Sequence, residues 1–177
     1  PFVSLEHRNF RLLWIGLLVS TTGSLMQNAA ILWHVSLLVP LDRKGLALGL
    51  VGLVRVIPII VFSMLSGVVA DAWNRRKLML LTQGAATIVA VVLAILTFQG
   101  LTQVWPIYLL AALGSAAGAF DLPARQSLIP MLVPREHLPN AISLNSIMFQ
   151  AASVLGPSVG GILIATSSAS FSISYFL

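Results

Sequence analysis

Charged and titratable side chains lie within or beside long apolar stretches of this sequence, where each one needs a partner. Asp71 and Arg75 are four residues apart and can pair on a helical turn, which makes a carboxylate near lipid far less costly. Asp121 follows another apolar stretch. His34 could transfer protons, because the reference pKa of histidine is near neutral, or it could simply pack. Arg55 lies within an apolar stretch. Its side chain either extends to the outer membrane interface, or it has a role in binding an anionic group or in gating.

Catalytic patterns are missing from the sequence. It has no nucleophile with a neighbouring base, no phosphate-binding loop ahead of a lysine and no clustered metal ligands. We therefore expect no enzyme, no catalytic residues, no metal and no cofactor. The chain also has no cysteine, which excludes a disulfide scaffold and thiolate metal sites.

The elements that position these groups are predicted to be membrane-spanning helices. Of 177 residues, 58% are hydrophobic and 8% are charged, against roughly 25% charged in an average soluble domain. Three windows hold no Asp, Glu, Lys or Arg at all, namely 12–41, 78–120 and 138–177. Because a helix crosses the hydrocarbon with about 20 apolar residues, each window holds one or two crossings. This composition excludes a water-soluble globule and predicts an all-α integral membrane protein in a lipid bilayer.

Turn-forming and polar residues divide the windows into five spans and the start of a sixth. The sequence begins at Pro1 and ends within an apolar run, so we expect a fragment open at both ends. The predicted spans cover residues 10–38, 47–70, 78–98, 105–122 and 140–165, with the sixth beginning near 169.

The distribution of positive charge predicts the orientation of these spans. A net charge of +5 does not indicate nucleic-acid binding here, because the basic residues lie in short loops between apolar runs. Cytoplasmic loops retain Lys and Arg, so a cytoplasmic N-terminus is favoured. It puts two basic residues outside, Arg43 and Lys44, and seven inside: Arg8, Arg11, Arg75, Arg76, Lys77, Arg125 and Arg135.

The loop after the second predicted span carries a recognisable pattern. The run Gly67–Lys77 reads GVVADAWNRRK and resembles the GxxxDRxGRR signature of the major facilitator superfamily, a family of twelve-helix secondary transporters. Ala72 stands where that pattern has Arg, and Asn74 stands where it has Gly, a mild change because Asn tolerates a left-handed backbone. Gly67 also continues a ridge of small residues toward Asp71, as Gly118 does toward Asp121.

This resemblance implies a fold and a role for the matching residues. Residues 1–177 would form the N-terminal six-helix half of a twelve-helix transporter, with the C-terminal half of the same transporter as partner. In that family the loop residues and an acidic residue of the fourth helix form a cytoplasmic latch between the halves. The corresponding residues here are Gly67, Asp71, Arg75, Arg76 and Asp121.

The fifth predicted span carries a second pattern. Residues 152–161 read ASVLGPSVGG and are similar to the GxxxGPxxGG signature of the drug:proton antiporter branch, with Ala152 in place of the leading glycine. Pro157 removes an intrahelical hydrogen bond and favours a kink, whereas Gly156, Gly160 and Gly161 allow a neighbouring helix to approach closely. A generic Gly/Pro-rich transmembrane helix is the alternative.

Residues 121–126 and 133–140 are similar to the enterobactin-exporter-like efflux branch of the superfamily. The RxxxG pattern of antiporter helix four is absent, and no Asp or Glu lies mid-membrane, so a coupling acid must be Asp121, lie in the C-terminal half or not exist. The sequence thus predicts a proton-coupled exporter of small hydrophobic or amphipathic molecules in the plasma membrane. A facilitator or importer on the same fold, or a non-transporting membrane scaffold or sensor, remains as an alternative.

Polar and aromatic residues inside the spans are the candidates for contact with a small-molecule substrate. A polar side chain facing lipid is costly, so each should face a cavity or another helix. Hydrogen bonding between helices is the competing role. The candidates are Gln27, Asn28, Trp33, His34, Arg55, Asn145 and Gln150.

Overall fold

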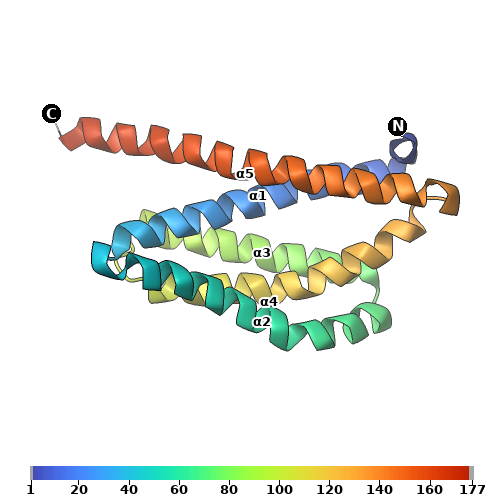
Figure 1. Ribbon diagram of the computed structural model, residues 1–177, viewed down its shortest axis with the longest axis horizontal. Helices are drawn as coiled ribbons and strands as arrows, with labels where there is room; N and C mark the ends of the chain where they lie inside the picture. Colours follow the sequence, from blue (N-terminus) through green and yellow to red (C-terminus); the bar gives the residue numbers. More distant parts are fainter. Residues whose placement is uncertain (1, 176–177) are drawn as a thin grey trace. The chain divides into compact units, whose positions relative to one another are not determined.

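The computed structural model describes the backbone of residues 2–175, and the side chains of these residues except 70–72 and 167–175. Five long α-helices account for most of the described chain (Figure 1). All five are long and apolar enough to cross a membrane, which confirms the predicted all-α membrane fold. Their bounds are α1 Arg8–Leu38, α2 Lys44–Ala72, α3 Arg75–Phe98, α4 Trp105–Leu128 and α5 Leu138–Tyr175.

Four short 3-10 helices flank the α-helices. They are η1 Val3–Glu6 before α1, η2 Leu41–Arg43 between α1 and α2, and η3 Ile129–Met131 and η4 Arg135–His137 between α4 and α5. The turn between α3 and α4 needs Gly100, whose φ of 76° is the only positive one among the described residues. A residue with a side chain is strained in that conformation.

Each α-helix extends beyond the span predicted for it. The largest extension among the first four is in α4, which continues through Pro123 to Leu128 and so places Arg125 one turn after Asp121. The backbone of α5 remains helical without a break to Tyr175, so no separate sixth helix begins near 169. The side chains of that last segment lie outside the described ones.

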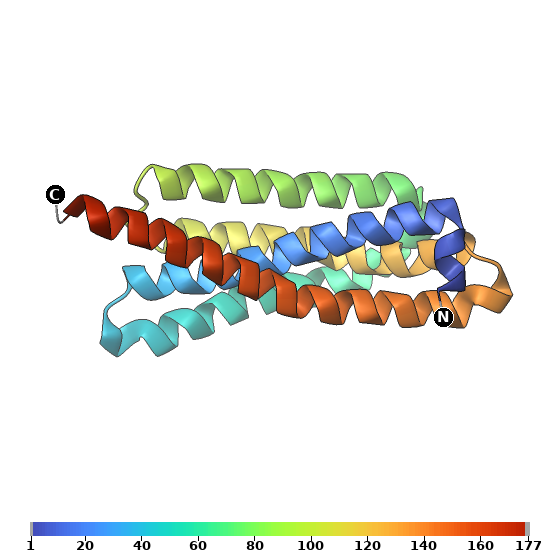
Figure 2. The ribbon, with the colours of Figure 1, turned by 90° about the horizontal axis from the view of Figure 1, so that it is seen from above.

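The chain divides into two compact units, and the first combines Pro1–Trp33 with Leu132–Leu177. Within it, α1 and α5 run parallel: Trp14 donates its Nε1 hydrogen to the carbonyl of Leu144 at 3.0 Å, and Thr22 lies against Gly156 further along both helices. Figure 2 shows α5 crossing α1. The face of α5 that is buried recurs every three or four residues, at 141, 144, 148, 152, 156 and 160.

The second unit, His34–Met131, is a bundle in which α4 lies between α2 and α3 (Figures 1 and 2). At one end, the Tyr108 hydroxyl of α4 donates to the carbonyl of Ala47 in α2 at 3.1 Å. Near the other end, the rings of Phe62 and Phe120 have centroids 5.7 Å apart. Contacts of this kind hold α4 against α2, while a polar cluster described below holds it against α3.

Large apolar side chains are widely exposed on the described helices. Met64 is 85% exposed and Ile88 is 65% exposed, although both lie in the middle of helices. Such a surface is unfavourable in water and suits lipid or a further apolar protein surface. The exposure therefore agrees with the membrane location of these helices.

Candidate functional site

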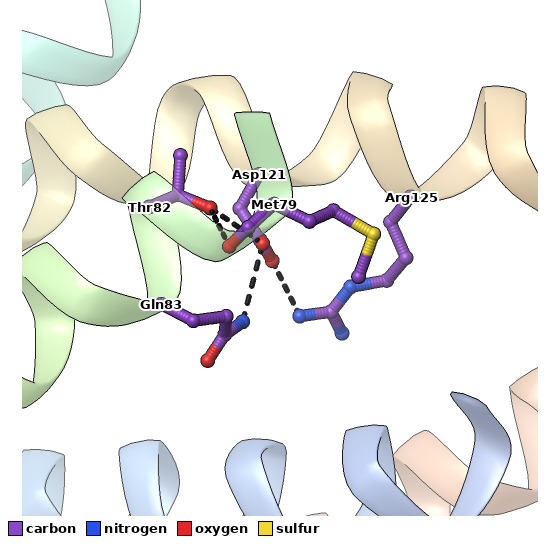
Figure 3. A network of polar contacts seen from close by, with 5 residues as sticks. All are labelled: Met79, Thr82, Gln83, Asp121 and Arg125. Carbon is purple, nitrogen blue, oxygen red and sulfur yellow. Dashed lines mark hydrogen bonds and ion pairs between the residues drawn. The ribbon is translucent and has the colours of Figure 1, made fainter. Parts of the chain in front are cut away.

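Asp121 is the centre of a buried polar cluster between α3 and α4 (Figure 3). Its Oδ1 accepts hydrogen bonds from the Thr82 hydroxyl at 3.0 Å and from Gln83 Nε2 at 3.1 Å. Its Oδ2 forms an ion pair with Arg125, one helical turn further along α4. The Thr82 hydroxyl is also within 3.0 Å of the Met79 carbonyl, so its one hydrogen serves either acceptor.

The cluster keeps a carboxylate in a region with little access to water. The side chain of Asp121 is 12% exposed and that of Arg125 is 15% exposed, so both charges are largely desolvated. A charge buried without a partner is expensive, whereas here each carboxylate oxygen has at least one donor and the pair is neutral overall. The arrangement therefore fixes α3 to α4.

The described side chains do not bring the predicted latch residues together. Asp121 contacts α3 and Arg125, while Arg75 Nη1 lies 2.9 Å from the sulfur of Met131 in η3. The side chain of Asp71 lies outside the described ones, and Arg76 is exposed beside the same loop. An added Cβ at Gly67 would meet nothing within 4 Å, so no described helix approaches closely there.

Asn74 stands where the family pattern has glycine, but it does not adopt the left-handed backbone that glycine allows. Its backbone is extended, with φ −65° and ψ 111°, and not left-handed. The side-chain Oδ1 instead caps α3 by accepting from the amides of Arg76 at 3.1 Å and Lys77 at 3.3 Å. Asn74 therefore stands in the position of the family's glycine as the N-cap of α3. The change from glycine is not explained by the tolerance of Asn for a left-handed backbone, because Asn74 does not adopt that backbone.

Gly156 and Gly160 of α5 lie in close contact with α1. A Cβ added to Gly156 would lie 2.8 Å from the Thr22 carbonyl oxygen and 3.0 Å from the Met26 amide nitrogen, both backbone atoms of α1. At Gly160 the nearest atom is Met26 Cγ at 2.9 Å, whereas at Gly161 nothing lies within 4 Å. Two of the three glycines thus face α1, and Pro157 lies between them within the continuous helix.

The substrate candidates fall into both units. Gln27, Asn28, Trp33, Asn145 and Gln150 belong to the first unit, whereas His34 and Arg55 belong to the second. His34 has its Nδ1 3.4 Å from the hydroxyl of Thr97 in α3, and Arg55 is half-buried in α2.

Asn145 differs from the other candidates of the first unit. Its Oδ1 is buried and accepts no hydrogen bond from the described residues, while Gln150 and Trp33 are exposed. An unsatisfied buried acceptor costs about 1–3 kcal/mol, so a donor brought to it would be bound favourably.

Sequence reasoning identified Asp121 but not its partners. Arg125 had a usable signal, since it follows Asp121 by four residues, a spacing at which two side chains of a helix can pair. Thr82 and Gln83 lie on a different helix, and no local pattern in the sequence assigns them to Asp121.

These features define a multi-pass α-helical membrane protein with a buried ion pair and a close parallel helix contact. Residues 1–176 match the family described as "Transmembrane secretion effector", a family of the major facilitator superfamily. The chain belongs to this family, and its relatives are transporters, not enzymes.

Three relatives illustrate the similarity. The uncharacterized MFS-type transporter YfiS of Bacillus subtilis (strain 168) is 29% identical over 79% of this chain and 30% of the relative. Macrolide efflux protein A of Streptococcus pyogenes is 28% identical over 87% of this chain and 37% of the relative. The enterobactin exporter EntS of Shigella boydii serotype 18 is 30% identical over 76% of this chain and 29% of the relative. The chain thus spans about a third of the length of these relatives, and no solved structure matches it.

Proposed function

We propose that this chain is part of a proton-coupled exporter that moves small hydrophobic or amphipathic molecules out of the cell by alternating access. The observation that carries the proposal is the contact of α1 with Gly156 and Gly160, in a run similar to the signature of the drug:proton antiporter branch. The names of two relatives, a macrolide efflux protein and an enterobactin exporter, support the outward direction.

Alternating access requires a second helical bundle opposite this one, because the substrate site lies at the interface of two repeats. We propose that the C-terminal half of the same transporter supplies it, with the N-terminus of this chain in the cytoplasm of a plasma-membrane protein. The excess of seven basic residues over two on the proposed cytoplasmic side supports this orientation. Among the substrate candidates we favour Asn145, because its buried Oδ1 accepts no hydrogen bond from the described residues.

The test of this function is the extrusion of a panel of lipophilic dyes from cells that express the complete open reading frame. We expect at least one dye to leave faster than from cells with an empty vector, and we expect a protonophore to abolish the difference. Extrusion that survives the protonophore contradicts proton coupling. Accelerated uptake in place of extrusion points to a facilitator or importer.

We also propose that Asp71, Arg75 and Asp121 act as a latch on the cytoplasmic side, with Gly67 and Arg76 in the same loop. Asp71→Asn removes one charge of the latch. A coupling free energy of about 1–3 kcal/mol changes an equilibrium between two states by about 5- to 150-fold. We therefore expect dye extrusion to fall at least about fivefold, while the amount of protein in the membrane, measured by immunoblot, stays the same. Asp42→Asn is the matched control, since the side chain of Asp42 is 73% exposed and pairs only with its neighbour Arg43. Equal extrusion by the two variants would remove the latch role.

A further inference from the structure

Two histidines from distant parts of the chain form a hydrogen bond in the first unit. His7, between η1 and α1, has its Nε2 3.0 Å from Nδ1 of His137, the last residue of η4. The ring centroids are 5.3 Å apart and the rings are tilted by 41°. Neither residue belongs to the buried cluster at Asp121 or to the contact at Gly156.

Ser4 adds two further hydrogen bonds at the same place. Its hydroxyl donates to the His137 carbonyl at 2.9 Å, and its amide donates to Asn140 Oδ1 at 3.1 Å. Ser4 is 0% exposed, although it lies so close to the N-terminal end of the sequence. We call the contacts among Ser4, His7, His137 and Asn140 the N-terminal clamp.

The clamp fixes the beginning of α1 to the beginning of α5. The His7 carbonyl accepts from the Arg11 amide at 2.9 Å, so His7 also forms part of the first turn of α1. On the other side, α5 begins at Leu138, directly after His137. A change in the histidine pair therefore acts on the ends of two helices that pack along each other.

A hydrogen bond between two imidazoles depends on how many protons the pair carries. One ring nitrogen must donate and the other must accept, and the pair meets this condition with no net charge or with one positive charge. A second proton makes both nitrogens donors and leaves two positive charges in contact. Only the fully protonated form of the pair is incompatible with the contact.

The charged residues near the histidine pair favour neither its hydrogen-bonded form nor its fully protonated form strongly. Glu6 and Arg8 flank His7 in sequence, and Arg135 and Glu136 precede His137, so each histidine has one neighbour of each sign. All four are exposed, as is Arg11, and α5 contributes no charged residue in its first turn. Screening by water weakens their influence, so the contact between the two rings dominates.

We propose that the N-terminal clamp is a pH-sensitive device, closed near neutral pH and released when acid protonates both histidines. Opening takes up at least one proton, because the open state holds two and the closed state at most one. The ratio of open to closed clamp therefore rises as the pH falls, by up to about tenfold per pH unit for each proton taken up. In the orientation proposed above, the clamp faces the cytoplasm and frees the end of α1 when that compartment becomes acidic.

The test is hydrogen–deuterium exchange of the purified protein, produced from its complete open reading frame in lipid nanodiscs and compared at pH 7.0 and 5.0. After correction for the intrinsic pH dependence of exchange, we expect protection of the peptide covering residues 2–11 to fall at least about tenfold at pH 5.0. Protection of α3 in the same sample should not change.

A paired variant separates the clamp from general acid effects. In His7→Gln/His137→Asn, the two amide groups replace Nε2 and Nδ1 and can still hydrogen bond, but neither titrates. We expect its protection at pH 7.0 to match the wild type and to stay there at pH 5.0, whereas His7→Ala is expected to lose protection at both pH values. A wild type without protection at pH 7.0, or an equal acid response in the paired variant, would overturn the proposal.

Discussion

Gly156→Ala is expected to destabilise the protein and to reduce dye extrusion, whereas Gly161→Ala is expected to leave its stability unchanged. The new methyl group at 156 would meet two backbone atoms of α1 at 2.8 and 3.0 Å, and backbone cannot move aside as a side chain can. Overpacking of a well-packed contact costs about 1–3 kcal/mol. At Gly161 nothing lies within 4 Å of the same methyl group.

Gly160→Ala should fall between these two variants. Its nearest neighbour is Met26 Cγ at 2.9 Å, and Met is a flexible side chain that adapts to a change in space. The measurement is thermal unfolding of the purified proteins in one detergent. The expected order of unfolding temperatures is Gly161→Ala highest, Gly160→Ala next and Gly156→Ala lowest. An equal loss at all three positions would show that the motif acts through helix flexibility and not through the contact with α1.

The effect of Gly156→Ala on extrusion follows from the same strain. Strain of about 1–3 kcal/mol that is present in only one of two access states changes their ratio by about 5- to 150-fold. We expect the rate of dye extrusion to fall by a comparable factor at an unchanged membrane level. An unchanged rate in a destabilised variant would show that α1 and α5 move as one body during transport.

The sequence predicted an all-α membrane fold because the bilayer imposes a simple requirement on composition. A window without charges that is long enough to cross the hydrocarbon has few alternatives to a helix, so 78–98 and 105–122 lie within α3 and α4. The helix ends depended on local geometry instead. Asn74 starts α3 through a side-chain cap, and α4 continues past Asp121, neither of which hydrophobicity alone indicates.

The site was less predictable, because its contacts join residues that are distant in sequence. The glycine motif predicted close packing, but only the structure distinguishes Gly156 and Gly160, which contact α1, from Gly161. The same kind of pattern at Gly67 has no close neighbour in the described chain. Small residues permit a close approach without specifying that it occurs.

Neutralising Asp121 alone is expected to cost more stability than neutralising it together with Arg125. Asp121→Asn keeps an Oδ1 that can accept from Thr82 and Gln83, but it leaves the largely buried guanidinium of Arg125 without its counter-charge. Removing one partner of a buried pair costs up to about 3–5 kcal/mol. Arg125→Gln leaves the carboxylate in the same position and should be similarly destabilising.

The double variant Asp121→Asn/Arg125→Gln has no uncompensated charge, so it should regain most of the loss. The coupling energy from the four proteins, measured by equilibrium unfolding in mixed micelles, is expected to be at least as large as the loss caused by either single substitution. Asp42→Asn serves as a control, because the pair of Asp42 with Arg43 is exposed and 3.7 Å apart and should contribute less than about 1 kcal/mol. Additive single effects at 121 and 125 would contradict a stabilising ion pair.

Extrusion by the same four proteins separates a structural carboxylate from one that carries protons. A structural role requires only that α3 and α4 stay together, so the double variant would extrude dye as well as it folds. A proton-carrying role requires a group that can gain and lose a proton, and an amide cannot do so at any physiological pH. Restored stability without restored gradient-dependent extrusion would therefore show that the Asp121 carboxylate acts in transport, as a latch residue or as a proton carrier, and recovery of both would move the search for the coupling group to another part of the transporter.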